Sequence, residues 1–411
     1  MGMAVTRMHI VLLHFYSHSP TPAYQQIAAS LRKRGHTVWI GARDTMGDLA
    51  WQDGEHAFDV TRGPSSPPGL LRAIPLLGAF AERLLFLGFI LRVRSFLRGS
   101  QPEIVQVNHA SVRWLAVLPL FMPRQMHFVL DFRQVGQRGA KDLIGRFKGW
   151  LTDSWRRFCS RYIFDAACFL HPAGARKILG ASWPKWGVVV PLGVSQRFLT
   201  LDEAVFDRRD DQGPVKFLYI GTLSKVRHLE RLLYAVQQAL SVTRDFRIDF
   251  IGLDSSQGFY RELIDELELD SVVKVLPPVP YQNVPEVIAS YDVALAYVPE
   301  RPAHWLYQPT MKVLEYRAVG TPIMASDNEP NRDIVREGQN GLLVQNTPES
   351  LADGLVRFVL DRSFLARCKA YARQMRQGET WDQVAGMYEQ DIYQTLVRVP
   401  LRAGRSGMSV E

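Results

Sequence analysis

The chain has 411 residues, enough for two or three domains, of which 47% are hydrophobic and 22% are charged. This composition excludes a disordered chain, a fibrous rod and a disulfide-stapled miniprotein. Three cysteines without any C-x-x-C spacing indicate free thiols in a reducing compartment and argue against a structural metal.

The net charge of +8 is distributed unevenly along the chain. Residues 1–200 hold 25 Lys and Arg against 11 Asp and Glu, a balance of +14, whereas residues 201–411 hold 24 against 30, a balance of −6. This split predicts that the first half meets a polyanion, either nucleic acid or an anionic membrane face. Because no nucleic-acid-binding fold or base-stacking pattern is recognised, we expect a membrane and no nucleic acid.

The most apolar window, Ala73–Leu91, carries Pro75, Glu82 and Arg83 near its centre. Charge is costly in hydrocarbon, so this window favours a buried or interfacial helix over a membrane span. The residues before the first predicted strand do not form a signal peptide. These features favour a cytoplasmic protein, peripheral on the inner face of the membrane.

The first half predicts a βαβ unit and therefore a parallel sheet. The apolar run His9–Phe15 is typical of a buried strand, and a helix through Ile27 ends at three cations before Gly35. The strand Thr37–Ile40 follows. Further strands are predicted at residues 104–107, 126–130 and 188–190.

The second half repeats this pattern after an apolar-poor linker at Leu201–Gly213. A strand at Val215–Ile220, a turn at Gly221 and a helix to about Leu240 come first. Later elements are predicted at residues 248–251, 272–276, 293–297, 309–319 and 322–324. The fold class is therefore α/β, with two Rossmann-like, doubly wound parallel-sheet domains facing a cleft, at residues 1–200 and 201–378.

Two segments of the second domain are candidates for an anion site. Gly221-Thr222-Leu223-Ser224-Lys225-Val226-Arg227 ends a strand at a glycine and adds two cations, as a phosphate would require. A solvated turn with surface cations is the alternative. The segment matches neither G-x-G-x-x-G nor a P-loop. It therefore lacks the sequence motif that is typical of a dinucleotide dehydrogenase or an NTPase.

The second segment is the short helix Pro309–Val319, with Pro309 expected at its first position and Gly320 just past its end. Its free N–H groups and positive dipole end form an anion site. Lys312 and Glu315 are three residues apart on one face, where a plain ion pair is the alternative. A carboxylate beside a phosphate site is best explained if it accepts hydrogen bonds from the hydroxyl groups of a sugar.

The segment Lys141–Arg161 has the pattern of a basic amphipathic helix with apolar side chains at steps of three and four. The upstream segment Leu70–Arg98 adds five arginines against one acid. Packing of both apolar stripes on the domain core is the plain alternative. A lipid-linked, phosphate-bearing acceptor at an anionic leaflet would account for the clustered cations.

In this order the motifs resemble the GT-B glycosyltransferases, specifically the large retaining family numbered four, over nearly the whole chain. The motifs that carry the resemblance are Arg34-Gly35-His36-Thr37-Val38, Pro102–His109, Val189–Val194, Tyr219–Leu223 with Arg227, the Pro309-to-Pro322 segment and Asn340–Val344. Trp381–Leu396 looks like the family's last helix, so residues 379–411 are expected to cross back to the first domain and end in a tail.

The resemblance implies roles for the candidate residues. Glu315 would hold the ribose of a nucleotide-sugar donor, and Arg227, with Lys225, would neutralise its diphosphate. His109 would reach the donor sugar, with a core or loop histidine as the alternative, and Gly193 would line the hinge. The expected catalytic residues are His109, Arg227 and Lys312; the expected donor-binding residues are Gly221, Thr222, Lys225, Arg227, Tyr307, Gln308, Thr310, Lys312 and Glu315.

Two positions depart from the family pattern. The family's first Glu falls on Tyr307, so sugar contacts must come from Tyr307, Gln308 or backbone N–H groups. The usual glycine pair after the first strand is replaced by Ser17–Pro22. Because no Asp-x-Asp motif is seen, we expect fixed cations in place of a metal, and no cofactor beyond the nucleotide-sugar co-substrate.

The leading interpretation is a retaining glycosyltransferase that moves a sugar from a nucleotide donor to a lipid-linked or glycan acceptor in cell-surface polysaccharide or glycolipid synthesis. The alternatives are a soluble GT-B transferase that makes a small-molecule glycoside, and an inactive two-domain nucleotide-sugar-binding protein.

Overall fold

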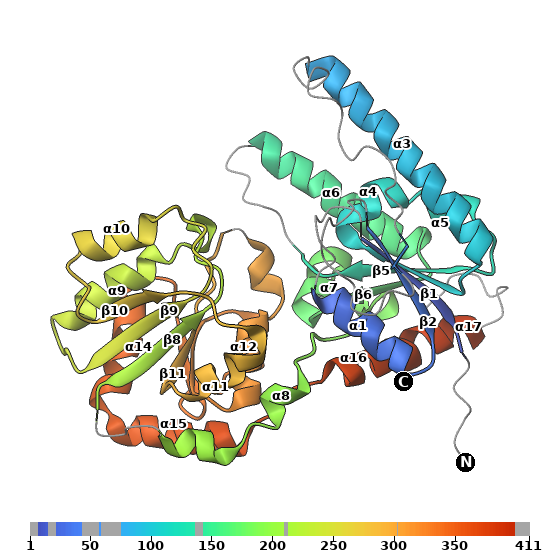
Figure 1. Cartoon of the computed structure of the whole chain (residues 1–411). Helices are drawn as coiled ribbons and strands as arrows, with labels where there is room; N and C mark the ends of the chain where they lie inside the picture. Colours follow the sequence, from blue (N-terminus) through green and yellow to red (C-terminus); the bar gives the residue numbers. More distant parts are fainter. Residues whose placement is uncertain are drawn as a thin grey trace, which may run out of the picture. The chain divides into compact units, whose positions relative to one another are not determined.

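The computed structural model describes residues 7–14, 22–42, 57–58, 75–135, 143–208, 213–301 and 303–398 (Figure 1). Most of the Ser17–Pro22 loop, together with Arg72 and Lys141, lies outside these residues. The chain divides into two compact units. The first comprises Met1–Gln134, Ala140–Gly193 and Trp381–Glu411, and the second comprises Val135–Gly139 and Val194–Thr380.

The first unit is built on a seven-stranded parallel sheet in the order β3-β2-β1-β4-β5-β6-β7. Its strands are β1 (His9–His14), β2 (Thr37–Ala42), β3 (Ala57–Phe58), β4 (Ile104–Asn108), β5 (His127–Phe132), β6 (Ala166–Phe169) and β7 (Val188–Val189). Residues Ile10–Leu13 of β1 are buried. Helices cover both faces of a parallel sheet, which explains why the central strands are continuous apolar runs.

The helices between these strands follow the chain order. They are α1 (Pro22–Lys33), α3 (Pro75–Ser100), α4 (Val112–Leu115), α5 (Leu118–Phe121), α6 (Leu143–Tyr162), α7 (Pro172–Leu179) and two short 3₁₀ turns, η1 (His109–Ser111) and η2 (Trp183–Lys185). The apolar window of the sequence lies largely within α3. Among the described residues, no helix combines the length and apolarity that a membrane span requires.

The second unit has a six-stranded parallel sheet in the order β10-β9-β8-β11-β12-β13. The strands are β8 (Val215–Ile220), β9 (Phe246–Ile251), β10 (Val273–Leu276), β11 (Val293–Ala296), β12 (Ile323–Ser326) and β13 (Gly341–Val344). Its helices include α8 (Gln196–Leu199), α9 (Glu230–Leu240), α10 (Phe259–Glu266), α11 (Val284–Ala289), α12 (Met311–Val319), α13 (Glu329–Arg332), α14 (Pro348–Leu360) and α15 (Arg362–Gln374). The predicted parallel α/β sheets are confirmed.

Two local predictions differ from the structure. The helix α12 begins at Met311 with Thr310 as its N-cap, because Thr310 has an extended backbone, so Pro309 lies before the cap rather than at the first helical position. In the predicted linker, Glu203–Arg208 forms a 3₁₀ turn, η3. Its single aromatic residue, Phe206, is buried under the guanidinium of Arg373, which anchors this apolar-poor stretch.

The last described elements are α16 (Trp381–Met387), the π-helical turn η7 (Tyr388–Tyr393) and α17 (Gln394–Arg398), which belong to the first unit. The α16 helix packs against α1, and Arg34 donates to the buried carboxylate of Glu389 at 2.7 Å. Where the chain enters and leaves the second unit, the Val194 N–H donates to the carbonyl oxygen of Glu379 at 2.8 Å. A Cβ on Gly193 would lie 2.8 Å from the Trp381 side chain, which explains the glycine there.

Candidate active site

The first part of the candidate site is the turn after β8. Gly221 has a φ of +143°, a conformation that favours glycine. A Cβ on the neighbouring Gly252 would lie 2.1 Å from the carbonyl oxygen of Gly221, so both residues at this sheet edge must be glycine. The role of Gly252 was not predicted from the sequence. The turn is held by hydrogen bonds between Leu223 and the loop after β9, both 2.9 Å long.

The second part is the N-terminus of α12. Tyr316 is fully buried, and its hydroxyl accepts a hydrogen bond from the N–H of Ile220 at 3.3 Å, which fixes the helix against the end of β8. Lys312 lies one turn earlier, and its ammonium would be 3.5 Å from a Cβ on Gly221. The structure therefore brings the two sequence motifs together.

Three polar atoms at the start of α12 are buried without a hydrogen-bond partner among the described residues. They are Gln308 Oε1, Thr310 Oγ1 and Lys312 Nζ. Thr310 is the N-cap residue, yet its hydroxyl makes no capping hydrogen bond. Buried polar groups are normally satisfied, because desolvation without a partner is costly. Their clustering indicates that this site is completed by a polar ligand.

The charges of the site also indicate that a ligand completes it. Burial lowers the pKa of Lys312 well below its usual range, and the nearby Arg227 lowers it further, against the opposite effect of Glu315. The Lys312 ammonium lies 3.7 Å from the centre of the Tyr219 ring, an unpredicted contact. Burial and a neighbouring guanidinium both disfavour the charged form of Lys312, and an anion such as a phosphate group would stabilise it.

Glu315 is also buried, at 7% exposure, and burial raises its pKa to about 7. The hydroxyl of Tyr281 donates to its Oε1 at 3.0 Å. Tyr281 lies in the 3₁₀ turn η5 (Tyr281–Asn283), 34 residues before Glu315, and no sequence motif marks it. The carboxylate is therefore oriented by a residue that sequence analysis missed.

The other predicted donor-binding residues surround this centre to different degrees. The guanidinium of Arg227 lies 4.3 Å from the ring centre of Trp305, a second residue that was not predicted. Lys225 is exposed and lies 4.9 Å from the ring centre of Phe259, so its placement gives no support for phosphate binding. Thr222 is exposed beside Gly221, and Tyr307 is partly buried in η6 (Ala303–Tyr307).

His109 belongs to the first unit, where it follows β4. The N–H of Arg133 donates to His109 Nδ1 at 3.3 Å, and the ring stacks on Phe132 with 5.7 Å between centroids. A ring nitrogen that accepts a hydrogen bond carries no proton, so the neutral imidazole has its proton on Nε2. His109 is thus held rigidly at a strand end, and its action on a donor sugar stays a prediction.

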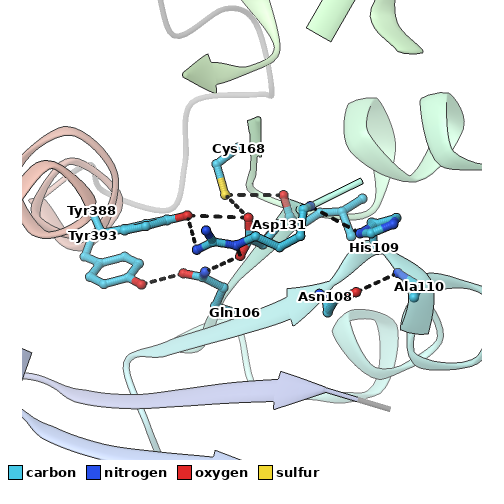
Figure 2. A network of polar contacts seen from close by, with 10 residues as sticks. Gln106, Asn108, His109, Ala110, Asp131, Cys168, Tyr388 and Tyr393 are labelled. Atoms are coloured by element: carbon cyan, nitrogen blue, oxygen red, sulfur yellow. Dashed lines mark hydrogen bonds and ion pairs between the residues drawn. The ribbon is translucent and has the colours of Figure 1, made fainter. Parts of the chain in front are cut away.

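A buried polar network supports this strand end (Figure 2). Asp131 accepts hydrogen bonds from Arg133 Nε and Gln106 Nε2, both at 2.8 Å. Tyr388 accepts from Arg133 at 2.9 Å, and Tyr393 donates to Gln106. The last helical segment is thereby bonded to the residues that hold His109.

Among the residues whose side chains are described, no group of three or more His, Cys, Asp or Glu residues is positioned to hold a metal ion.

Residues 202–375 match the model of the family described as "Glycosyl transferases group 1". The chain is similar to D-inositol 3-phosphate glycosyltransferase of Nocardioides sp., with 28% identity over 41% of this chain and 39% of that protein. The same-named protein of Acidothermus cellulolyticus is 24% identical over 88% of this chain and 83% of its own length. Matches to five of these curated relatives span less than half of those proteins, between 38% and 45%.

Solved structures match over nearly the whole chain. Sucrose-phosphate synthase from Thermosynechococcus elongatus aligns with a TM-score of 0.73 and 16% identity, covering 96% of this chain and 100% of that one. Anabaena Alr3699/HepE, solved in complex with UDP and glucose, aligns with a TM-score of 0.68 and 15% identity at the same coverage. The chain therefore has the GT-B fold, and its residues 202–375 are similar to the glycosyl transferases group 1 family.

Proposed function

We propose that this protein is a retaining glycosyltransferase that uses a nucleoside-diphosphate-sugar as its donor. The observation that carries the proposal is the cluster of unpartnered, buried polar atoms beside Arg227 at the start of α12. A diphosphate would supply a negatively charged partner for Lys312 and Arg227. A ribose would supply hydroxyl groups that donate hydrogen bonds to Glu315.

Each residue then has a task in the transfer. When the bond between the sugar and the diphosphate breaks, negative charge grows on the leaving group. Lys312, Arg227 and the N-terminus of α12 would stabilise that charge in a largely desolvated site, usually the largest single catalytic effect. Glu315 would hold the ribose in place, and Tyr281 would orient its carboxylate.

The acceptor is proposed to be lipid-linked or a glycan, reached from the cytoplasmic side at an anionic membrane surface. The support is the balance of +14 in residues 1–200, which suits a phosphate-bearing lipid and an anionic leaflet. Cell-surface polysaccharide or glycolipid synthesis is the process that such an acceptor implies.

A small-molecule acceptor is the second candidate. It is favoured by the name that the matched relatives share, D-inositol 3-phosphate glycosyltransferase. A soluble transferase of this kind would need no membrane surface. The two candidates share the donor chemistry and differ only in the acceptor.

A thermal-shift screen of nucleoside diphosphates and nucleotide-sugars, followed by transfer assays, tests the proposal. A bound nucleotide at 100 times its Kd should add about 2.7 kcal/mol to the free energy of unfolding. Arg227→Ala should abolish most of the shift, because it removes a cation that the diphosphate needs. If no nucleotide raises the melting temperature, the donor site is wrongly assigned. Binding without transfer to lipid-linked or soluble acceptors would favour an inactive binding protein.

A further inference from the structure

The helix α6 is packed with its apolar face outward. Its apolar side chains form what we call the α6 aromatic face, and all of them are 41–79% exposed: Leu143, Ile144, Phe147, Trp150, Leu151, Trp155, Phe158 and Tyr162. The rings contact one another along the helix, with 5.9 Å between the centroids of Phe147 and Trp150 and 5.7 Å between those of Trp155 and Phe158. The plain alternative, that this stripe packs on the domain core, does not hold for these side chains.

The opposite face of α6 explains this orientation. Gly149 and Ser160 are buried there, and Asp153 and Arg156 form an ion pair at 3.4 Å with little exposure. These residues and the buried Cys159 allow the helix to approach its unit closely without using large apolar side chains. A soluble helix normally does the reverse, so the α6 aromatic face is the surface that needs a cover.

The charges around the α6 aromatic face indicate what kind of surface covers it. At 100° per residue, the α6 aromatic face occupies an arc of about 140° that also includes Ser154 and Arg161, with Arg146 on one border and Lys148 on the other. Both cations are exposed. The only acid of the helix, Asp153, is neutralised by Arg156 on the buried face. An apolar arc bordered by cations and rich in Trp and Tyr matches the interface of an anionic bilayer.

The remaining arginines of α6 have a different role from the one expected. Arg157 donates to the carbonyl oxygen of Ile178 at 2.6 Å, and Arg161 donates to that of Leu179 at 2.8 Å. They therefore hold the C-terminal half of α6 against the C-terminus of α7. Arg156, Arg157 and Arg161 are thus unsuitable for a test of lipid binding, because their loss would disturb this packing.

A second helix presents apolar side chains in the same part of the unit. In α3, Leu84, Leu87 and Leu91 are about half exposed at steps of three and four. The helix α4 contacts both α3 and α6, and Figure 1 shows the three helices on one face of the first sheet. The apolar surface is therefore wider than one helix.

We infer that α6 lies in the plane of an anionic lipid bilayer, with the α6 aromatic face inserted between the headgroups and Arg146 and Lys148 bound to lipid phosphates. This inference rests on the membrane association proposed above and assigns it to one surface. It differs from a purely electrostatic attachment, because the apolar side chains supply binding that survives moderate salt.

The test is flotation of the full chain with vesicles of phosphatidylcholine and phosphatidylglycerol in equal amounts. The double variant Phe147→Ser/Trp150→Ser should bind about 100-fold more weakly, roughly tenfold for each aromatic side chain removed from the interface. The matched control is Val242→Ser/Leu360→Ser, which alters two side chains of the second unit that are 60% and 61% exposed and should float like the parent. Arg146→Gln/Lys148→Gln should weaken flotation at low salt and have little further effect at high salt.

A second measurement reports insertion directly. Vesicles with brominated acyl chains should quench the tryptophan fluorescence of the parent, and Trp150→Phe/Trp155→Phe should lose most of that quenching while still floating. Nucleoside-diphosphate binding, measured by calorimetry on the same preparations, should be equal in all variants.

The outcomes separate the hypotheses. If the parent floats and Phe147→Ser/Trp150→Ser floats equally well, another surface binds the membrane and this inference fails. If the parent binds nucleotide but no vesicle, membrane association fails and the donor proposal stands. If the parent is a dimer without lipid and the double variant is a monomer, the α6 aromatic face is an interface between two copies, which also overturns the inference.

Discussion

Lys312 is an ammonium group that the fold buries over the ring of Tyr219, with no hydrogen-bond partner for Nζ among the described residues. A second lysine of the same unit, Lys369, is also largely buried, but it lies 2.7 Å from the carboxylate of Asp292. We propose that Lys312 is a cation kept for a ligand, whereas Lys369 is a cation that stabilises the fold. This difference can be measured.

Lys312→Met should raise the free energy of unfolding by about 1–2 kcal/mol, because it removes an unpaired, desolvated charge close to Arg227. The same variant should bind nucleoside diphosphates at least tenfold more weakly, since a charge-assisted hydrogen bond is worth about 1.5–3 kcal/mol. Chemical denaturation and calorimetry measure the two effects. Lys369→Met is the control and should destabilise the protein, because Asp292 would remain buried without its partner. A loss of stability in Lys312→Met would contradict a ligand role.

Glu315→Gln should preserve the fold and weaken donor binding by about 1.5–3 kcal/mol, because the amide no longer accepts two charge-assisted hydrogen bonds from a diol. Burial raises the pKa of Glu315 to about 7, so the carboxylate that binds the ribose forms as the pH rises from 6 to 8. Donor affinity of the parent should therefore increase over that range. The part of this increase that comes from Glu315 should be missing in Glu315→Gln. Titration of the ligand phosphate should contribute equally to the pH dependence of both proteins. Calorimetry at pH 6, 7 and 8 provides the comparison.

Stability should change in the opposite direction. A carboxyl group whose folded pKa is raised stabilises the fold below its unfolded pKa, and this contribution is lost as the pH rises through about 7. The melting temperature of the parent should therefore fall more between pH 5 and pH 8 than that of Glu315→Gln. Equal pH dependence of the two proteins would mean that Glu315 does not titrate in this range.

At the level of elements, the last helical segment is part of the first unit's interior. Tyr388 and Tyr393 bond to the same Asp131–Arg133–Gln106 network that supports His109 (Figure 2). The π-helical turn η7 places both tyrosines toward the sheet. The end of the chain therefore stabilises a strand end that lies more than 250 residues earlier.

Asp131→Asn should destabilise the first unit by about 3–5 kcal/mol, because the buried guanidinium of Arg133 would lose its counter-charge. Amide exchange in residues 381–398 should accelerate at the same time, since Tyr388 and Tyr393 bond to this network. Asp353→Asn, at an exposed position of α14, is the control and should change stability by less than about 0.5 kcal/mol. Unchanged exchange in residues 381–398 would show that the network does not hold the helix.

At the level of the whole molecule, the anion site depends on fixed cations. Lys312 and Arg227 are positioned by two different elements, the helix α12 and the turn after β8, that meet only in the folded second unit. Their charges are available without a metal. The protein can therefore be tested in chelator.

Transfer activity should persist in EDTA, because Arg227, Lys312 and the α12 N-terminus neutralise the leaving diphosphate. Initial rates should agree within a factor of about two with and without EDTA. The double variant Arg227→Ala/Lys312→Met should lose most of the activity and should not regain it with Mg²⁺. Strict dependence of the parent on added Mg²⁺ or Mn²⁺ would show that the cations do not replace a metal.

The sequence by itself determined the parallel sheets, most of their strands and the two motifs of the proposed donor site. Continuous apolar runs, cations before a helix-ending glycine and the order of the motifs are local signals, because burial on both faces of a strand and helix termination act over a few residues. Tyr281, Trp305 and Gly252 left no such signal. Each contacts a site residue that is distant along the chain, so only tertiary structure identifies it.

Tertiary structure also decided the orientation of α6. Helical periodicity reveals that a helix has an apolar face, but the period is the same whether that face is buried or exposed. The buried face of α6 contains Gly149, Cys159, Ser160 and the Asp153–Arg156 pair, and Arg157 and Arg161 bond to carbonyl oxygens at the end of α7. These contacts join residues about 20 positions apart, so the outward direction of the aromatic side chains follows from packing and not from the sequence pattern.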